Sequence, residues 1–138
     1  VCGHPRIVSA FADVKDNSDS GQFIATQKAA AVALDDDSIP TAINAKYRRR
    51  LQKLVDTLKR CGFDCKMPGG SYFLYTRAPK AQRGATSETT FAKAEDATRF
   101  LIEQHGIVTV PWDDAGPFLR FSVTYVAADE KEEDRLME

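Results

Sequence analysis

The sequence predicts an α+β fold, in which a small, mostly antiparallel sheet carries helices packed on one face. After about residue 36, segments rich in β-branched and aromatic residues alternate with segments whose apolar residues recur at helical spacing. Some β-rich segments are joined by tight turns, which pair strands antiparallel, and others by a helix, which makes a crossover. Residues 1–35 are predominantly helical, and we expect them to belong to a part of the protein that is otherwise missing here.

The helices follow from apolar spacing and from residues that begin or end helices. Pro5 suits a first helical turn, and Ser20 is expected to cap a second helix after a polar break over residues 15–21. Gly62 and Gly106 are expected to end a long helix and a shorter one. The predicted helices cover residues 5–14, 20–34, 41–60 and 93–104, and a last acidic helix starts near Asp129.

The strands follow from β-rich composition between turn signals. Four are predicted: Phe63–Lys66, Ser71–Thr76, Ile107–Val110 and Phe118–Val123. Residues 77–90 mix Arg, Lys, Pro, Gly, Ser and Thr without a period, so we expect a loop there.

Composition excludes several classes of partner. The 138 residues carry 19 basic and 20 acidic side chains, for a formal net charge of −1, so we expect neither nucleic acid nor a membrane as a partner. The basic run Arg48–Arg50 is interpreted as the solvated face of the long helix. Three cysteines, an odd number, indicate a reduced, cytoplasmic compartment.

Candidate metal, phosphate and acid–base sites are each better explained as structural. Cys61 and Cys65 lie four residues apart, but zinc needs about four ligands and both histidines are distant in sequence, so we expect no metal site. The turn Pro68–Gly70 leads into a strand rather than a helix, which favours a flexible turn over a phosphate loop. The adjacent Asp113 and Asp114 are expected to be solvated.

Arg120 is the residue that its own strand does not explain. It stands between Leu119 and Phe121, and a guanidinium keeps its charge in a protein. Strand alternation places Arg120 on the polar face of the sheet. Two interpretations stay open from this pattern: an arginine that is solvated or paired with a carboxylate such as Asp113, or an arginine that binds a ligand.

Taken together, several segments resemble the carboxy-terminal part of the class I/II, fold-type I aminotransferases that use pyridoxal phosphate. Pro68–Phe73 resembles the family's P-x-G-[GA]-x-[YF] motif, and Leu119–Ser122 resembles its [LV]-R-[ILF]-[SC] strand. Val108–Pro111 resembles the loop after the family's last crossover helix, and Asp19–Leu34 is similar to the helix after its cofactor-lysine region. The order and spacing of these segments carry the resemblance, which is strongest to the LL-diaminopimelate aminotransferase-like branch.

The resemblance implies both an activity and a division of the chain. Residues 1–35 would be the helical tail of a large cofactor-binding domain, and residues 36–138 the small domain. The full enzyme would be a homodimer that uses pyridoxal 5'-phosphate to move an amino group between an amino acid and a 2-oxo acid. Arg120 would bind the substrate's α-carboxylate. The cofactor lysine would lie before Val1, so the chain alone would hold no catalytic residue and be inactive.

Two alternatives accompany this interpretation. A pyridoxal-phosphate-dependent carbon–sulfur lyase of the same fold keeps the same arginine, and a non-enzymatic α+β binding module could carry a similar strand. The segment Trp112–Pro117 departs from the glycine and phenylalanine pattern common in the family, which leaves the substrate open.

Overall fold

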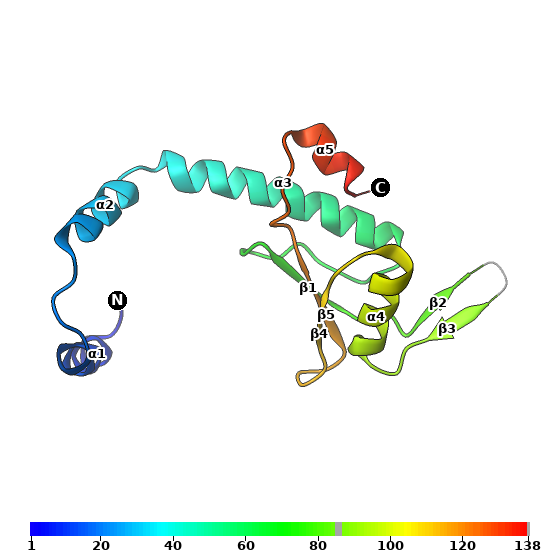
Figure 1. The fold of residues 1–138 in the computed structure, drawn as a ribbon, viewed down its shortest axis with the longest axis horizontal. Helices are drawn as coiled ribbons and strands as arrows, with labels where there is room; N and C mark the ends of the chain where they lie inside the picture. Colours follow the sequence, from blue (N-terminus) through cyan, green and yellow to red (C-terminus); the bar gives the residue numbers. More distant parts are fainter. Residues whose placement is uncertain (85–86, 138) are drawn as a thin grey trace. The chain divides into compact units, whose positions relative to one another are not determined.

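The computed structural model describes residues 1–84 and 87–137, and the chain divides into two compact units, residues 1–41 and 42–138. The elements in chain order are α1 (Pro5–Ser18), α2 (Ile24–Leu34), α3 (Ser38–Arg60), β1 (Phe73–Arg77), β2 (Ala81–Arg83), β3 (Glu88–Thr90), α4 (Ala94–His105), β4 (Val110–Trp112), β5 (Phe118–Ser122) and α5 (Glu130–Arg135) (Figure 1). None of the helices in the described part of the chain is long and apolar enough to cross a membrane.

The first unit consists of α1, α2 and the first turn of α3. The polar break predicted over residues 15–21 is present but begins later, because α1 continues to Ser18 and α2 starts only at Ile24. The side chains of Asn17 and Ser18 donate to the carbonyl oxygens of Asp13 and Val14 one turn back, at 2.7 and 2.8 Å, so these polar residues are accommodated in the last turn of the helix. The predicted cap at Ser20 is wrong: α2 begins at Ile24 without a side-chain cap.

The second unit confirms the α+β prediction. Its three-stranded antiparallel sheet has the order β1-β5-β4, so β5 is central, and α3 and α4 both contribute to the core beneath it (Figure 1). Side chains of α3, α4, β1 and β5 form this core: Leu51, Leu54, Val55, Leu58, Leu74, Ala94, Ala97, Leu119 and Phe121. The opposite face of the sheet therefore stays free of the core.

Three predicted strand or loop segments need correction. Phe63–Lys66 is not a strand, because the amide of Phe63 donates to Leu58 at the end of α3 and the Asp64 carbonyl accepts from the Thr76 hydroxyl. The third strand begins at Val110 rather than at Ile107. The amide of Ile107 donates to the carbonyl oxygen of Leu101 in α4, so it is not available to a strand. The predicted loop 77–90 contains the β2–β3 hairpin, and its residues 85 and 86 lie outside the described part.

A buried ionic cluster attaches α5 to α3, and it corrects the prediction that Arg48–Arg50 form a solvated face. Arg50 and Glu133 are each only 2 % exposed, and their side chains are joined at 2.7 Å. Arg49 adds two hydrogen bonds of 3.0 Å to the same carboxylate. Arg50 follows the spacing of Leu54 and Leu58 along the inner face of α3, and the acid on α5 compensates its charge.

This cluster predicts a specific loss of stability in acid. Hydrogen bonds from Arg49 and Arg50 outweigh the effect of burial and lower the pKa of Glu133 from 4.5 to about 2. A lowered folded-state pKa gives stability that is complete above pH 4.5 and is lost as the pH falls toward 2. We expect the difference in unfolding free energy between the wild type and Glu133→Gln to shrink over this interval. Urea titrations from pH 7 to pH 2 test this, and a constant difference would contradict it.

Candidate functional site

The open face of the three-stranded sheet carries cationic and aromatic side chains side by side. In the register of the sheet, Arg120 on β5 lies opposite Tyr75 on β1 and Val110 on β4. Its strand neighbours Leu119 and Phe121 are buried in the core, so Arg120 faces away from the core, as strand alternation predicts.

The guanidinium of Arg120 lies between two aromatic rings. Its central carbon is 4.4 Å from the ring centre of Phe73 on β1 and 5.7 Å from that of Trp112 on β4. Such stacking holds a planar guanidinium while its N–H groups stay available as donors. Sequence reasoning missed both rings as partners. Phe73 is a diagonal cross-strand neighbour of Arg120, but its role depends on a register that the sequence alone does not define.

The structure does not join Arg120 to Asp113, the acid that we considered as its internal partner. Among the described residues, no carboxylate lies within ion-pair distance of Arg120. Asp113 instead accepts hydrogen bonds from the amides of Ala94 and Glu95, at 2.8 and 3.2 Å. These amides lie in the first turn of α4, so Asp113 is not simply solvated: it caps a helix from a distant loop.

We expect Asp113→Ala to lower the free energy of unfolding by about 1–2 kcal/mol, because two amides at the positive end of α4 lose a charged acceptor. The matched control is Asp114→Ala, because both aspartates are exposed and, among the described residues, only the Asp113 side chain accepts from the α4 amides. Urea unfolding of both variants measures the difference. Equal stability of the two variants would contradict the assigned cap.

The far end of β5 is fixed from beneath the sheet. Arg50 donates from Nη1 to the carbonyl oxygens of Val123 and Tyr125, at 3.2 and 2.6 Å, and its guanidinium lies over the Tyr125 ring at 4.3 Å. These carbonyls follow directly after the strand that bears Arg120. The ionic cluster therefore restrains the backbone that positions Arg120.

The turn before β1 leaves open space rather than a tight approach. A Cβ atom at Gly69 or Gly70 would meet nothing within 4 Å in this chain. Ser71 takes the left-handed region, with φ of 74°, and its hydroxyl accepts from the Phe73 amide at 3.2 Å. The turn thus directs the backbone into the strand that supplies one of the rings beside Arg120.

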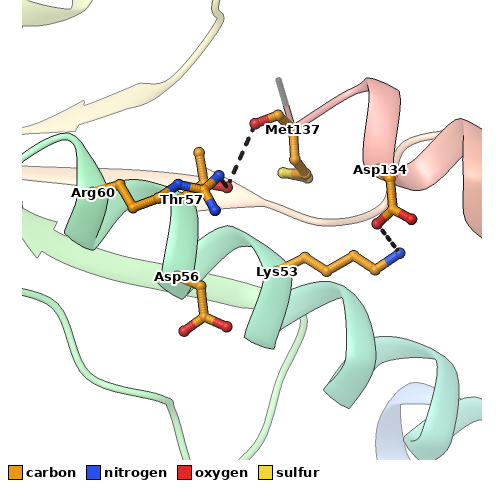
Figure 2. A pocket seen from close by; sticks show the side chains of 6 residues that line it. All are labelled: Lys53, Asp56, Thr57, Arg60, Asp134 and Met137. Carbon is orange, nitrogen blue, oxygen red and sulfur yellow. Dashed lines mark hydrogen bonds and ion pairs between the residues drawn. The ribbon is translucent and has the colours of Figure 1, made fainter.

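A separate hollow of about 290 Å³ lies between α3 and α5, away from the open face of the sheet (Figure 2). Lys53 and Asp134 form an ion pair across it, and the Thr57 hydroxyl is within 3.5 Å of the Met137 carbonyl oxygen. Six residues line the hollow, and within it Arg60 also donates to the Thr57 hydroxyl at 2.9 Å: Lys53, Asp56, Thr57, Arg60, Asp134 and Met137. It is part of the contact between the two helices.

The described residues offer neither a metal-binding cluster nor a cysteine pair. No group of three potential metal ligands comes together within residues 1–84 and 87–137. Cys61 is exposed and Cys65 is buried, and both are free thiols. The Cys65 thiol lies 3.7 Å from the Val55 carbonyl oxygen, and burial raises the pKa of this thiol.

Comparison with known proteins gives one consistent result. A family model described as aminotransferase class I and II matches residues 1–138. The LL-diaminopimelate aminotransferase of Methanococcus maripaludis is 46 % identical over 99 % of this chain, which covers 33 % of that protein. The protein of the same name from Methanocaldococcus jannaschii is 46 % identical over 93 % of the chain, covering 30 % of that protein.

The fold is shared with a solved structure. The aspartate aminotransferase from Rhizobium meliloti superposes with a TM-score of 0.73 at 23 % identity, over 96 % of this chain and 34 % of that one. The chain therefore spans about a third of the length of the proteins that it matches.

Proposed function

This chain belongs to the class I and II aminotransferase family, and from that membership we propose that the complete protein transfers an amino group between an amino acid and a 2-oxo acid. Both LL-diaminopimelate aminotransferases are 46 % identical to the chain, so we propose LL-diaminopimelate as the amino donor. The observation that carries the proposal within the chain is the guanidinium of Arg120, held between two rings on the open face of the sheet.

We assign Arg120 the role of binding the α-carboxylate of the substrate. A guanidinium donates two parallel hydrogen bonds to a carboxylate, so it fixes the orientation of the bound acid as well as its position. Amino-group transfer requires a defined direction of the bonds at Cα, and holding the carboxylate restricts that direction. The rings of Phe73 and Trp112 hold the Arg120 guanidinium in place before the substrate binds. Less side-chain entropy of Arg120 is therefore lost on binding.

Members of this family generally depend on pyridoxal 5'-phosphate, which acts as an electron sink at the substrate's Cα when it is bound. Such a cofactor needs a lysine for its aldehyde and several donors for its phosphate. The contacts of Arg120 that were described above are with aromatic rings. No lysine contact has been described beside Arg120; Lys53, for example, pairs with Asp134 between α3 and α5. These contacts support our assignment of Arg120 to the substrate side of the site.

We therefore propose that the cofactor lysine and phosphate contacts come from the part of the enzyme outside residues 1–138. On this proposal, residues 1–35 belong to the large cofactor-binding domain and residues 36–138 form the small domain of a homodimer. None of the lysines here lies in a sequence context that resembles the family's cofactor lysine. We expect residues 1–138 alone to be inactive.

The test is an amino-transfer assay of the complete enzyme with LL-diaminopimelate and a panel of 2-oxo acids. Formation of a new amino acid from the acceptor, at a rate that depends on both substrates, supports the proposal. Release of a thiol and ammonia from a sulfur-containing amino acid without any acceptor would instead identify a carbon–sulfur lyase. Residues 1–138, assayed in parallel with added cofactor, should show no transfer.

A further inference from the structure

A second arginine shares the open face of the sheet with Arg120. Arg77 on β1 pairs in register with Phe118 on β5, two residues before Arg120. Its guanidinium carbon lies 5.2 Å from the centre of the Phe118 ring. Phe118 and Arg120 are on the same side of β5, so Arg77 and Arg120 lie on one face as diagonal cross-strand neighbours.

Neither of these two arginines forms an ion pair among the described residues. Within the described part of the chain, neither Arg77 nor Arg120 lies within ion-pair distance of a carboxylate, although the protein has more acidic than basic side chains. Half of the ten arginines do contact carboxylates: Arg49, Arg50, Arg83, Arg99 and Arg135. Arg6, Arg48 and Arg60 have no such contact among the described residues either, so what sets Arg77 and Arg120 apart is that they lie together on one face of the sheet. Two uncompensated positive charges on one face repel each other, and a ligand with two negative charges removes that repulsion.

We propose that Arg77 binds the second, distal carboxylate of a dicarboxylic substrate whose α-carboxylate is bound by Arg120. This inference rests on the proposed function, and it deepens it by naming the residue that selects dicarboxylic acids. LL-diaminopimelate has the required chemistry, since its two carboxylates stand at opposite ends of a carbon chain. Each guanidinium can meet its carboxylate through a pair of parallel hydrogen bonds.

The register of the sheet gives a spacing that suits such a molecule. Diagonal neighbours in an antiparallel pair have Cα atoms about 7–8 Å apart, and arginine side chains are long enough to adjust the distance between their ends. Tyr75 lies next to both arginines, opposite Arg120 and on the same face of β1 as Arg77. Its ring meets that of Trp112 at 6.1 Å, and these rings offer an apolar surface to the methylene groups of the substrate.

Two acids without amino groups separate the contribution of each arginine. Heptanedioate carries a carboxylate at both ends of its chain, and heptanoate carries one. Their dissociation constants with the complete enzyme are measured by calorimetry, so the readout does not depend on turnover. We expect the wild type to bind heptanedioate more tightly than heptanoate, and Arg77→Met to lower that preference by roughly tenfold or more, as expected for a lost charged hydrogen bond.

Matched variants define the outcome. Arg83→Met removes a cation from the β2–β3 hairpin, where Arg83 pairs with Glu88, and should keep the wild-type preference. Arg120→Lys should weaken both acids. If Arg77→Met folds poorly, Arg77→Gln replaces it in the same titrations. The inference is overturned if the wild type shows no preference for heptanedioate, or if the Arg77 variants retain it.

The same experiment keeps the two proposals apart. If the wild type prefers heptanedioate and loses this preference in Arg77→Met, yet transfers no amino group, the proposed function fails and the assignment of Arg77 stands. If amino transfer from LL-diaminopimelate proceeds with an unchanged KM in Arg77→Met, the assignment of Arg77 fails and the proposed function stands.

Discussion

Glu133→Gln is expected to lower the free energy of unfolding by about 3–5 kcal/mol, the range for breaking a buried ion pair from one side. The substitution keeps the size of the side chain but removes its charge. Arg50 is 2 % exposed, so its guanidinium would stay buried without a compensating anion. The same carboxylate also accepts from Arg49 and lies 3.6 Å from the Lys53 ammonium.

Urea unfolding and melting temperature measure this loss. A change of this size should lower the Tm by roughly 10 °C or more in a domain of about 100 residues. Glu130→Gln is the matched control on the same helix, because Glu130 is 66 % exposed and pairs with Arg49 at 3.2 Å. An exposed pair contributes about 0–1 kcal/mol, so this control should be nearly neutral. Similar losses in both variants would show that the cluster is not the main attachment of α5.

A double variant separates the ion pair from the helix contact as a whole. Arg50→Met with Glu133→Leu removes both charges and leaves apolar side chains of similar size. Replacing both partners of a buried pair is often neutral or stabilising, so the double variant should be more stable than Glu133→Gln alone. It also removes the hydrogen bonds from Arg50 to Val123 and Tyr125, so any remaining loss reports on the anchoring of β5.

The sequence predicted the elements whose signals are local. Helical spacing with Gly106 in the left-handed region ends α4 as expected, with φ of 67°. Alternation placed Leu119 and Phe121 inside and Arg120 outside. The errors occur where a distant partner decides the outcome: Phe63–Lys66 has strand-like composition, but its backbone groups are taken by α3 and by the Thr76 side chain.

The candidate site shows the same division. Arg120 could be found because a charged residue interrupts an apolar strand. Its stacking on Phe73 and Trp112 could not be found, since it depends on the order β1-β5-β4 and on the register of three strands. Asp113 has the composition of a solvated loop residue, and only the folded chain brings it to the amides of α4.

Arg120→Lys, made in the complete enzyme, is expected to lower kcat/KM for amino transfer by on the order of tenfold to several hundredfold. Lysine keeps the positive charge but lacks the planar guanidinium, so a single point charge replaces two parallel hydrogen bonds to the carboxylate. A charged hydrogen bond is worth roughly 1.5–3 kcal/mol, and each 1.4 kcal/mol corresponds to about tenfold in rate. An ammonium also stacks less well between Phe73 and Trp112, so its position is less restricted.

Three measurements on this variant distinguish a binding role from a structural one. On the binding role, kcat/KM falls while cofactor content and Tm stay close to wild type, because Arg120 has no carboxylate partner among the described residues and its loss breaks no ion pair there. Arg99→Lys is the matched control: Arg99 is an exposed arginine on α4, paired with Glu95 one turn away, and its replacement should leave all three quantities unchanged. Normal turnover of Arg120→Lys with a lowered Tm would return Arg120 to a structural role in the sheet.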